Sequence, residues 1–144
     1  MILADELETV ELGRKLAAVL RPGDVVTLSG PLGVGKTSLV RGVLAALGHE
    51  GEVPSPSFAI VQPYEGLDPP VWHVDLFRID DVSEMDELGL DSVSNGVLLV
   101  EWPEKAGAGA WPQALGLSLD FAEGGARRLT ANVTPSWQTR WPPA

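Results

Sequence analysis

Apolar residues recur three and four positions apart in two stretches of the N-terminal third of the chain, which is the pattern of an amphipathic helix. The first stretch contains Leu12, Leu16, Val19 and Leu20. Thr9 precedes it and is predicted to be the helix N-cap, and a Pro-Gly turn within residues 21–24 ends the helix. The second stretch contains Leu39, Val40, Val43, Leu44 and Leu47. Gly48 follows as its expected C-cap, so the pattern predicts two helices.

Short runs of apolar and β-branched residues predict strands. The runs at 25–29 and 97–100 are almost wholly apolar, as expected of buried strands in a mostly parallel sheet. The runs at 58–62 and 71–76 flank a loop rich in Pro, Gly and acidic residues, so two neighbouring strands are predicted. Apolar residues alternate along 115–121 and again along 129–133, around a Gly-Gly turn. This last pair predicts a hairpin with one buried face.

Two further segments have a distinct composition. Residues 80–91 hold six acidic side chains and no basic one, and with Asp81 or Ser83 as cap they predict a short acidic helix. Residues 135–144 contain three prolines and little periodicity, which predicts a poorly ordered tail. The domain is therefore expected to span residues 1–134.

Charge and cysteine content narrow the possible functions. Ten basic residues against twenty acidic ones give a net charge of −10, which argues against a broad surface for nucleic acid or anionic lipid. The absence of cysteine excludes disulfides and thiolate-bound metals. No apolar run reaches the roughly 18 residues of a membrane span, and the acidic N-terminus is unlike a signal peptide. A cytoplasmic protein is expected, without a membrane partner.

The segment 30–37 reads Gly-Pro-Leu-Gly-Val-Gly-Lys-Thr and matches the G-x-x-x-x-G-K-[ST] phosphate-binding loop. Glycines allow the backbone amides to converge on phosphate oxygens at the start of a helix, while Lys36 reaches the β and γ phosphates and Thr37 ligates Mg²⁺. A predicted strand precedes the loop and a predicted helix follows it, which is the context that the motif requires. We therefore expect a single α/β domain with a three-layer, P-loop NTPase-like fold, whose central sheet is mostly parallel with antiparallel additions.

Two acidic residues are candidates for the metal and water site. Glu101 ends the apolar run at 97–100, which is the pattern of an acid at the carboxyl end of a buried strand. Asp75 lies within the apolar run at 71–76, where an unpaired carboxylate would be costly. A salt bridge at a strand end is the alternative for both. Which of the two is the principal ligand or base stays open.

Three further segments, together with the phosphate loop, resemble one family. They are Ser55-Pro56-Ser57-Phe58, His73-Val74-Asp75-Leu76-Phe77-Arg78 and Leu99-Val100-Glu101-Trp102-Pro103. In order and spacing the motifs resemble the TsaE (YjeE) family, the P-loop ATPases of bacterial threonylcarbamoyladenosine synthesis. The resemblance runs from about Thr9 to Val133.

The resemblance implies a role for each matching residue. The phosphate-binding positions are Gly30, Leu32, Gly33, Val34, Gly35, Lys36, Thr37 and Ser38. The metal positions are Thr37, Glu101 and Asp75, and the catalytic positions are Glu101, Lys36 and Asp75. Further nucleotide contacts are expected from Trp102, Ser57, Arg78, Glu6 and Thr9.

Several of these positions have a structural alternative. Trp102 could serve in aromatic packing, and His73 could be a core histidine. Arg78 could pair with Asp75 or approach phosphate, and Thr9 could cap the first helix. Ser57 stands where the family usually has Thr, in a loop similar to a γ-phosphate sensor.

The resemblance also implies a Mg²⁺-dependent ATPase, slow in isolation, that acts with the TsaD and TsaB subunits. The modification is threonylcarbamoyladenosine at position 37 of transfer RNA, and contact with the RNA would be only indirect, through the complex. ATP and Mg²⁺ are the implied ligands.

Other functions of a phosphate loop fit less well. A small P-loop kinase would need a lid rich in arginine, yet the basic residues after Arg41 are few: Arg78, Lys105, Arg127, Arg128 and Arg140. A GTPase would need Asn-Lys-x-Asp, which the sequence lacks. A nucleotide-gated binding module, in which hydrolysis is incidental, remains an alternative.

Overall fold

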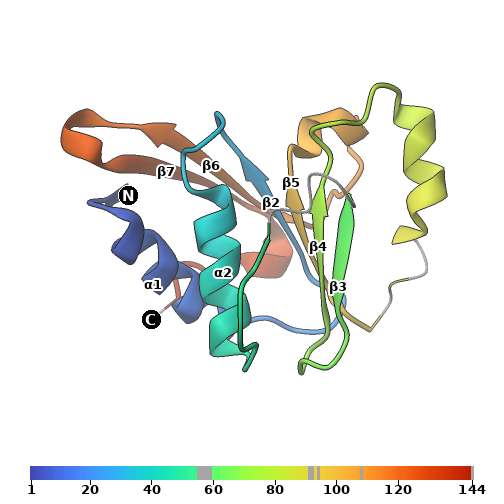
Figure 1. Ribbon diagram of the computed structural model, residues 1–144, viewed down its shortest axis with the longest axis horizontal. Helices are drawn as coiled ribbons and strands as arrows, with labels where there is room; N and C mark the ends of the chain where they lie inside the picture. Colours follow the sequence, from blue (N-terminus) through green and yellow to red (C-terminus); the bar gives the residue numbers. More distant parts are fainter. Residues whose placement is uncertain (55–59, 91–92, 94, 108, 144) are drawn as a thin grey trace.

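A seven-stranded mixed sheet forms the centre of the molecule, in the order β1-β7-β6-β2-β5-β4-β3. The computed structural model describes residues 1–54, 60–90, 93, 95–107 and 109–143 (Figure 1). The strands are β1 (Ile2–Leu3), β2 (Val25–Ser29), β3 (Val61–Tyr64), β4 (Val71–Asp75), β5 (Val97–Glu101), β6 (Leu115–Phe121) and β7 (Arg127–Val133). β2 pairs in parallel with β5 and β6, β5 pairs in parallel with β4, and the outer pairs are antiparallel. The predicted α/β fold, with a mostly parallel central sheet and antiparallel additions, is confirmed.

Two α-helices, α1 (Glu6–Ala17) and α2 (Lys36–Ala46), lie side by side over one face of this sheet (Figure 1). Glycines let their backbones approach closely. A Cβ atom on Gly13 would lie 2.1 Å from the carbonyl oxygen of Leu39, and one on Gly42 would lie 2.0 Å from that of Val10. Any larger side chain at either glycine would therefore push the two helices apart.

Side chains of β5 alternate between two cores, which shows how the layers are built. Val97 and Leu99 belong to the core under α1 and α2. Leu98 and Val100 belong to a smaller core on the other face, which short 3₁₀ segments cover. Within the described residues, the 3₁₀ segments are η1 (Val82–Leu88), η3 (Pro103–Ala106), η4 (Glu123–Gly125) and η5 (Pro135–Trp137). Because both faces of β5 are covered, its apolar residues need not alternate with polar ones.

Some element ends differ from the predictions. α1 begins at Glu6 with Asp5 as N-cap, and the Asp5 carboxylate accepts a hydrogen bond from the Glu8 amide at 3.0 Å. Thr9 is not the cap, because it lies one turn inside the helix and is fully buried. The acidic segment forms a 3₁₀ helix, with Asp81 as its cap. β3 begins at residue 61, later than predicted, and residues 58 and 59 lie outside the described chain.

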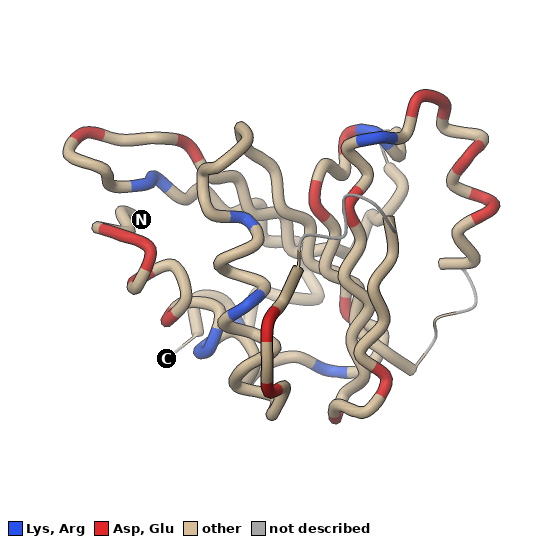
Figure 2. The backbone as a smooth tube through the Cα atoms, viewed as in Figure 1, with Lys and Arg blue, Asp and Glu red and all other residues tan. Residues whose placement is uncertain are grey.

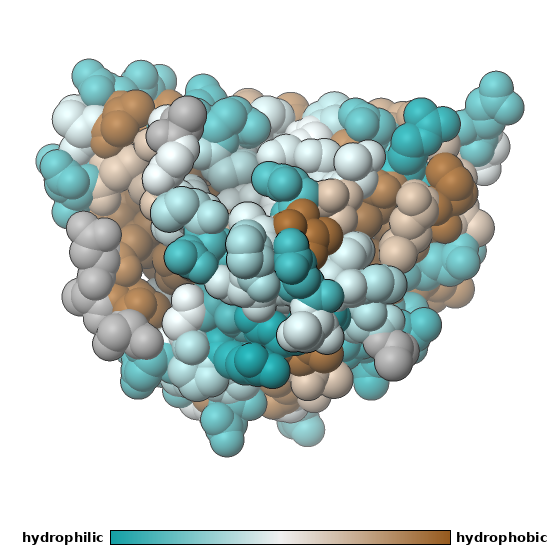
Figure 3. All heavy atoms as spheres, turned by 180° about the vertical axis from the view of Figure 1, so that it is seen from behind, coloured by the Kyte–Doolittle hydropathy of each residue, from teal (hydrophilic) through white to brown (hydrophobic). Residues whose placement is uncertain are grey.

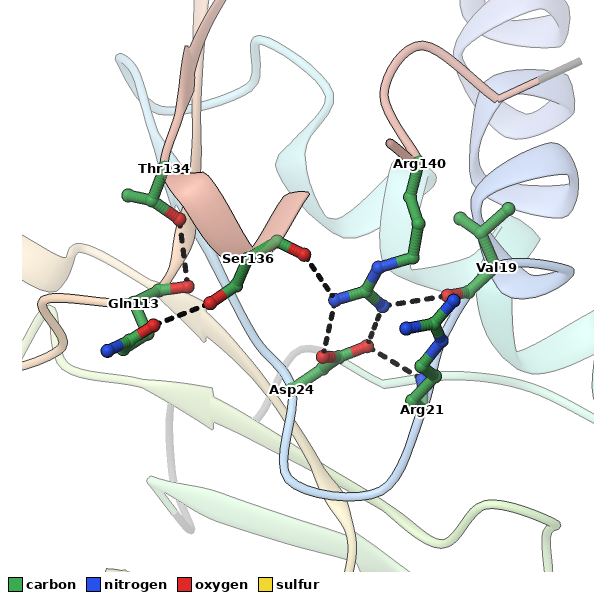
Figure 4. A network of polar contacts seen from close by, with 7 residues as sticks. All are labelled: Val19, Arg21, Asp24, Gln113, Thr134, Ser136 and Arg140. Atoms are coloured by element: carbon green, nitrogen blue, oxygen red, sulfur yellow. Dashed lines mark hydrogen bonds and ion pairs between the residues drawn. The ribbon is translucent and has the colours of Figure 1, made fainter. Parts of the chain in front are cut away.

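Residues 135–143 pack against the domain, so the prediction of a poorly ordered tail is wrong for them. Trp137 is 1% exposed. Arg140 donates hydrogen bonds of 2.6 and 3.0 Å to the two carboxylate oxygens of Asp24 and one of 2.9 Å to the carbonyl of Val19 (Figure 4). Burial of Trp137 and the hydrogen bonds of Arg140 hold the segment against the domain. Two single residues produce no periodic pattern, so this packing could not be predicted from the sequence.

Acidic residues recur along η1 and the turn before it, as the red segments of the backbone in Figure 2 show. Figure 3 shows the opposite side of the molecule, where the centre is mostly hydrophilic and hydrophobic residues gather toward the sides. In the described part of the chain, no helix combines the length and the apolar character needed to cross a membrane.

Candidate nucleotide site

The loop between β2 and α2 has the backbone of an anion cradle. Gly33 and Gly35 adopt φ angles of 76° and 118°, in the left-handed region that residues with a Cβ atom rarely occupy. A Cβ atom on Gly33 would meet no atom within 4 Å, so the loop is open at this point. Gly35 is also the N-cap of α2 and supplies no side chain to its free amides. Those amides are thus available to an anion at the positive end of the helix.

A cavity of about 430 Å³ opens beside this loop. Its walls come from the loop, from the first turn of α2 and from the carboxyl ends of β4 and β5. The lining residues are Leu32, Gly33, Gly35, Lys36, Thr37, Ser38, Asp75, Phe77, Arg78, Glu101 and Trp102. The structure thus brings together, at the carboxyl end of the parallel strands, segments that are far apart in the sequence.

Asp75 and Glu101 end two neighbouring parallel strands and lie opposite each other in register. They are only 6% and 3% exposed. The Thr37 hydroxyl donates a hydrogen bond of 3.0 Å to Oε2 of Glu101. The three predicted metal positions therefore converge on the cavity, although they come from β4, β5 and α2.

His73 does not line the cavity, but it forms a hydrogen bond with the Glu101 carboxylate. Its Nε2 lies 2.6 Å from Oε2 of Glu101, and the ring is fully buried. An ionised carboxylate only accepts hydrogen bonds, so the network assigns the proton to Nε2. Nδ1 is buried and has no hydrogen-bond partner among the described residues. Thr37 and His73 both bond Oε2 of Glu101, so two hydrogen bonds fix this oxygen of the carboxylate.

Lys36 is held between a backbone carbonyl and an aromatic ring. Its ammonium donates to the carbonyl of Gly30 and lies 3.7 Å from the ring centroid of Trp102. Trp102 has a left-handed backbone, with φ of 59°, which is costly for a bulky residue. Phe77 packs against the same ring, with centroids 4.9 Å apart. The strained backbone of Trp102 therefore brings its ring over the lysine.

Burial shifts two of the charged groups in the cavity. It lowers the pKa of Lys36 below the ordinary lysine value, against the opposing attraction of Glu101 and Asp75. Burial also raises the pKa of Asp75 above the ordinary aspartate value, and the Glu101 charge acts in the same direction. The Phe77 amide, which donates to Oδ1 of Asp75 at 2.9 Å, opposes this rise in pKa. A bound cation would relieve the crowding of the two carboxylates.

The other predicted site residues have varied positions. Gly30 does not line the cavity, but its carbonyl accepts a hydrogen bond from Lys36. Val34 does not line the cavity either and is fully buried. Glu6 does not line the cavity, but its carboxylate accepts hydrogen bonds from the hydroxyl of Ser38 at 3.0 Å and from Arg41 at 3.3 Å.

Thr9 lies behind Gly35, and its hydroxyl donates to the carbonyl of Asp5. Arg78 lines the cavity. Ser57, with the segment Ser55-Pro56-Ser57-Phe58, lies outside the described residues.

The residues present fit a nucleotide with Mg²⁺. Proteins hold Mg²⁺ with one or two carboxylates together with substrate phosphates, and Thr37, Glu101 and Asp75 offer a hydroxyl and two carboxylates. In the described part of the chain, no group of three or more His, Cys, Asp or Glu is placed to hold a metal by itself. The open cradle at Gly33 and the buried ammonium of Lys36 suit phosphate oxygens.

Sequence reasoning missed two contributors to this site. Phe77 lines the cavity and packs on Trp102, but its place in the family motif gave no reason to assign it a role. Arg127, at the start of β7, donates to the carbonyl of Val34 at 3.0 Å. Only the fold brings Arg127 to the loop, since the hydrogen-bonded residues are 93 positions apart.

Comparison with known proteins gives concordant results. The family model described as "Threonylcarbamoyl adenosine biosynthesis protein TsaE" matches residues 3–129. A relative from Streptomyces coelicolor, named tRNA threonylcarbamoyladenosine biosynthesis protein TsaE, is 45% identical over 86% of this chain and 86% of its own. One of the same name from Haemophilus influenzae is 36% identical over 78% of this chain and 75% of its own. The crystal structure of YdiB from Bacillus subtilis superposes with a TM-score of 0.75 and 29% identity, covering 91% of this chain and 82% of that one.

Proposed function

Because this chain belongs to the TsaE family of threonylcarbamoyladenosine biosynthesis proteins, we propose that it binds and hydrolyses Mg-ATP in the cavity beside the phosphate loop. The observation that carries the proposal is the hydrogen bond of 3.0 Å between Thr37 and Glu101 at the mouth of this loop. It joins the first turn of α2 to the end of β5, and these are the segments from which Thr37 and the strand-end carboxylates would hold a metal beside bound phosphates. The adjacent Lys36 completes a set suited to phosphoryl transfer.

The residues of the chain divide the work as follows. Backbone amides within residues 32–37 and the Lys36 ammonium bind and neutralise phosphate oxygens, which stabilises charge that develops in the transition state. Thr37 and Asp75 would hold Mg²⁺ together with the phosphates. Held there, Mg²⁺ would supply electrostatic polarisation of the phosphoryl group.

Glu101 is placed to orient the attacking water. Its Oε2 is occupied by two hydrogen bonds, so Oε1 is the atom that can accept a proton from water in the cavity. Fixing one carboxylate oxygen also fixes the direction of the other. A base that is already oriented accelerates proton transfer, because it need not be ordered during the reaction. His73 therefore acts on the reaction through Glu101 and need not touch substrate.

We further propose that hydrolysis serves a complex with the TsaD and TsaB subunits in the cytoplasm. The family acts in tRNA modification, whereas the net charge of −10 disfavours direct binding of this chain to RNA. Both observations are consistent with contact between the RNA and a partner subunit. In a nucleotide-gated module, by contrast, ATP would order a docking surface and turnover would be incidental.

The experiment that tests the proposed function has two arms. Calorimetric titration with ATP in the presence of Mg²⁺ should show one site on the isolated chain, and Lys36→Ala should abolish it. ATPase activity should then rise when purified TsaB and TsaD are added together. Absence of ATP binding would refute the site. Intact binding and complex formation without any hydrolysis would favour the nucleotide-gated module instead.

A further inference from the structure

Arg127 bridges two segments that lie far apart in the sequence. Its Nε donates to the carbonyl of Val34 in the phosphate loop at 3.0 Å, and its Nη1 donates to the carbonyl of Gly125 at 2.8 Å. Gly125 ends η4, the turn of the β6–β7 hairpin. One guanidinium thus joins the back of the phosphate loop to the tip of this hairpin.

The loop needs such a donor because of its own geometry. When successive amides converge on an anion, the carbonyls between them must point away from it and find donors elsewhere. Val34 is fully buried, so water is a poor donor for its carbonyl. A charged donor forms a stronger hydrogen bond than a neutral one. Arg127 therefore meets a requirement that the cradle itself creates.

The guanidinium also lies against Gly35, the N-cap residue of α2. A Cβ atom on Gly35 would lie 3.7 Å from Nε of Arg127 and 3.5 Å from Cγ2 of Thr9. Together these side chains form the outer wall of the loop at its last glycine. Arg127 does not line the cavity on the inner side, so any effect on a nucleotide passes through the loop.

We propose that Arg127 is a positioning residue for nucleotide binding. By holding the carbonyl of Val34 away from the cavity, it keeps the amides of residues 35–37, at the start of α2, directed toward a bound phosphate, and it couples the order of this loop to the hairpin turn at 122–126. The amide of Val34 itself donates to the carbonyl of Pro31 at 3.3 Å. The inference rests on the proposed ATP site. Coupling is reciprocal, so a nucleotide that orders the loop should also stabilise the hairpin turn.

The test compares Arg127→Met with Arg128→Met. The neighbour offers a matched control, because side chains alternate along β7 and Arg128 is exposed on the other face. Both variants lose one positive charge from the same strand. Calorimetry should show ATP and ADP binding weakened on the order of tenfold in Arg127→Met and by less than about twofold in Arg128→Met, since only a fraction of the loops would stay preorganised. The KM for ATP should rise, while kcat at saturating ATP should change little.

A second readout separates positioning from general support of the fold. Hydrogen exchange at the hairpin amides of Ala122 and Ala126, which bond within the turn, should slow when ATP binds the wild-type chain. This slowing should be absent in Arg127→Met. If that variant does not fold, Arg127→Lys decides the matter, because its single ammonium cannot hold both carbonyls in the same geometry, so ATP should slow this exchange much less.

Several results would overturn the proposal. These are wild-type affinity in Arg127→Met, an equal loss in both methionine variants, or full hairpin protection by ATP in a folded Arg127 variant. In each case the ATP site of the wild-type chain stands. If wild-type chain itself binds no ATP, the proposed function fails first.

Discussion

Asp75 and Lys36 face one cavity, and burial moves both of their pKa values toward the neutral form of each group. For Asp75, the carboxylate of Glu101 on the neighbouring strand adds to this effect. A raised pKa in the folded state means that the charged carboxylate is less favourable there than in the unfolded chain. The cavity therefore holds a carboxylate at a cost to folding, which is typical of a functional site.

Asp75→Asn should stabilise the metal-free protein at neutral pH. The amide oxygen of Asn can still accept the hydrogen bond from Phe77, while the unfavourable charge is gone. The free energy of unfolding of the wild type should rise toward that of the variant as the pH falls through the folded pKa of Asp75, and the difference between the two should close below its unfolded value. Urea unfolding of both proteins from pH 7 to about pH 3, with a chelator present, measures this, because the range extends below the ordinary aspartate pKa. A variant less stable than the wild type at pH 7 would contradict the prediction.

His73→Leu should destabilise the fold by about 1–3 kcal/mol, because the buried carboxylate of Glu101 would lose a donor. Hydrolysis should fall more than ATP affinity, since the orientation of Glu101 matters to water and less to phosphate. His73→Gln is the matched control, because its amide nitrogen can occupy the place of Nε2. Equal turnover in the Leu and Gln variants would show that the hydrogen bond has no part in catalysis.

At the scale of elements, the sequence predicts β2, the phosphate loop and α2 well, because local patterns determine them. Periodicity, glycines and the motif lie within one continuous stretch. β1 was not predicted, since two residues carry no pattern and pair only once β7 is in place. The tail was mispredicted for a related reason. Trp137 and Arg140 have no periodic neighbours, and Asp24, the partner of Arg140, is 116 positions from it.

Arg140→Met should lower the free energy of unfolding by about 3 kcal/mol, because it leaves the largely buried carboxylate of Asp24 without its ion pair. The control is Arg14→Met, which breaks an exposed pair with Glu11 at 4.0 Å and should cost less than about 1 kcal/mol. Thermal and urea unfolding of both variants measure the difference. Similar small losses in the two would mean that the tail contributes nothing to stability.

The whole molecule brings together what no local stretch contains. The candidate site combines the start of α2 with the carboxyl ends of β4 and β5. The parallel order β2-β5-β4 places all three at the same end of these strands. The sequence predicted Lys36, Thr37 and Glu101 through their motifs. The hydrogen bond from His73 and the bridge from Arg127 could not be predicted, because they depend on register and on a hairpin that returns to the loop.

In the proposed function, Glu101 acts in turnover and Lys36 acts in binding. The most direct measurement is ATP affinity and single-turnover hydrolysis of Glu101→Gln beside Lys36→Ala, with the TsaB and TsaD subunits present. Glu101→Gln should bind Mg-ATP within about threefold of the wild type and lose hydrolysis by at least about 10²-fold, the usual size of a general-base effect. Lys36→Ala should lose both. Hydrolysis at the wild-type rate by Glu101→Gln would contradict the account and would transfer the role of base to Asp75.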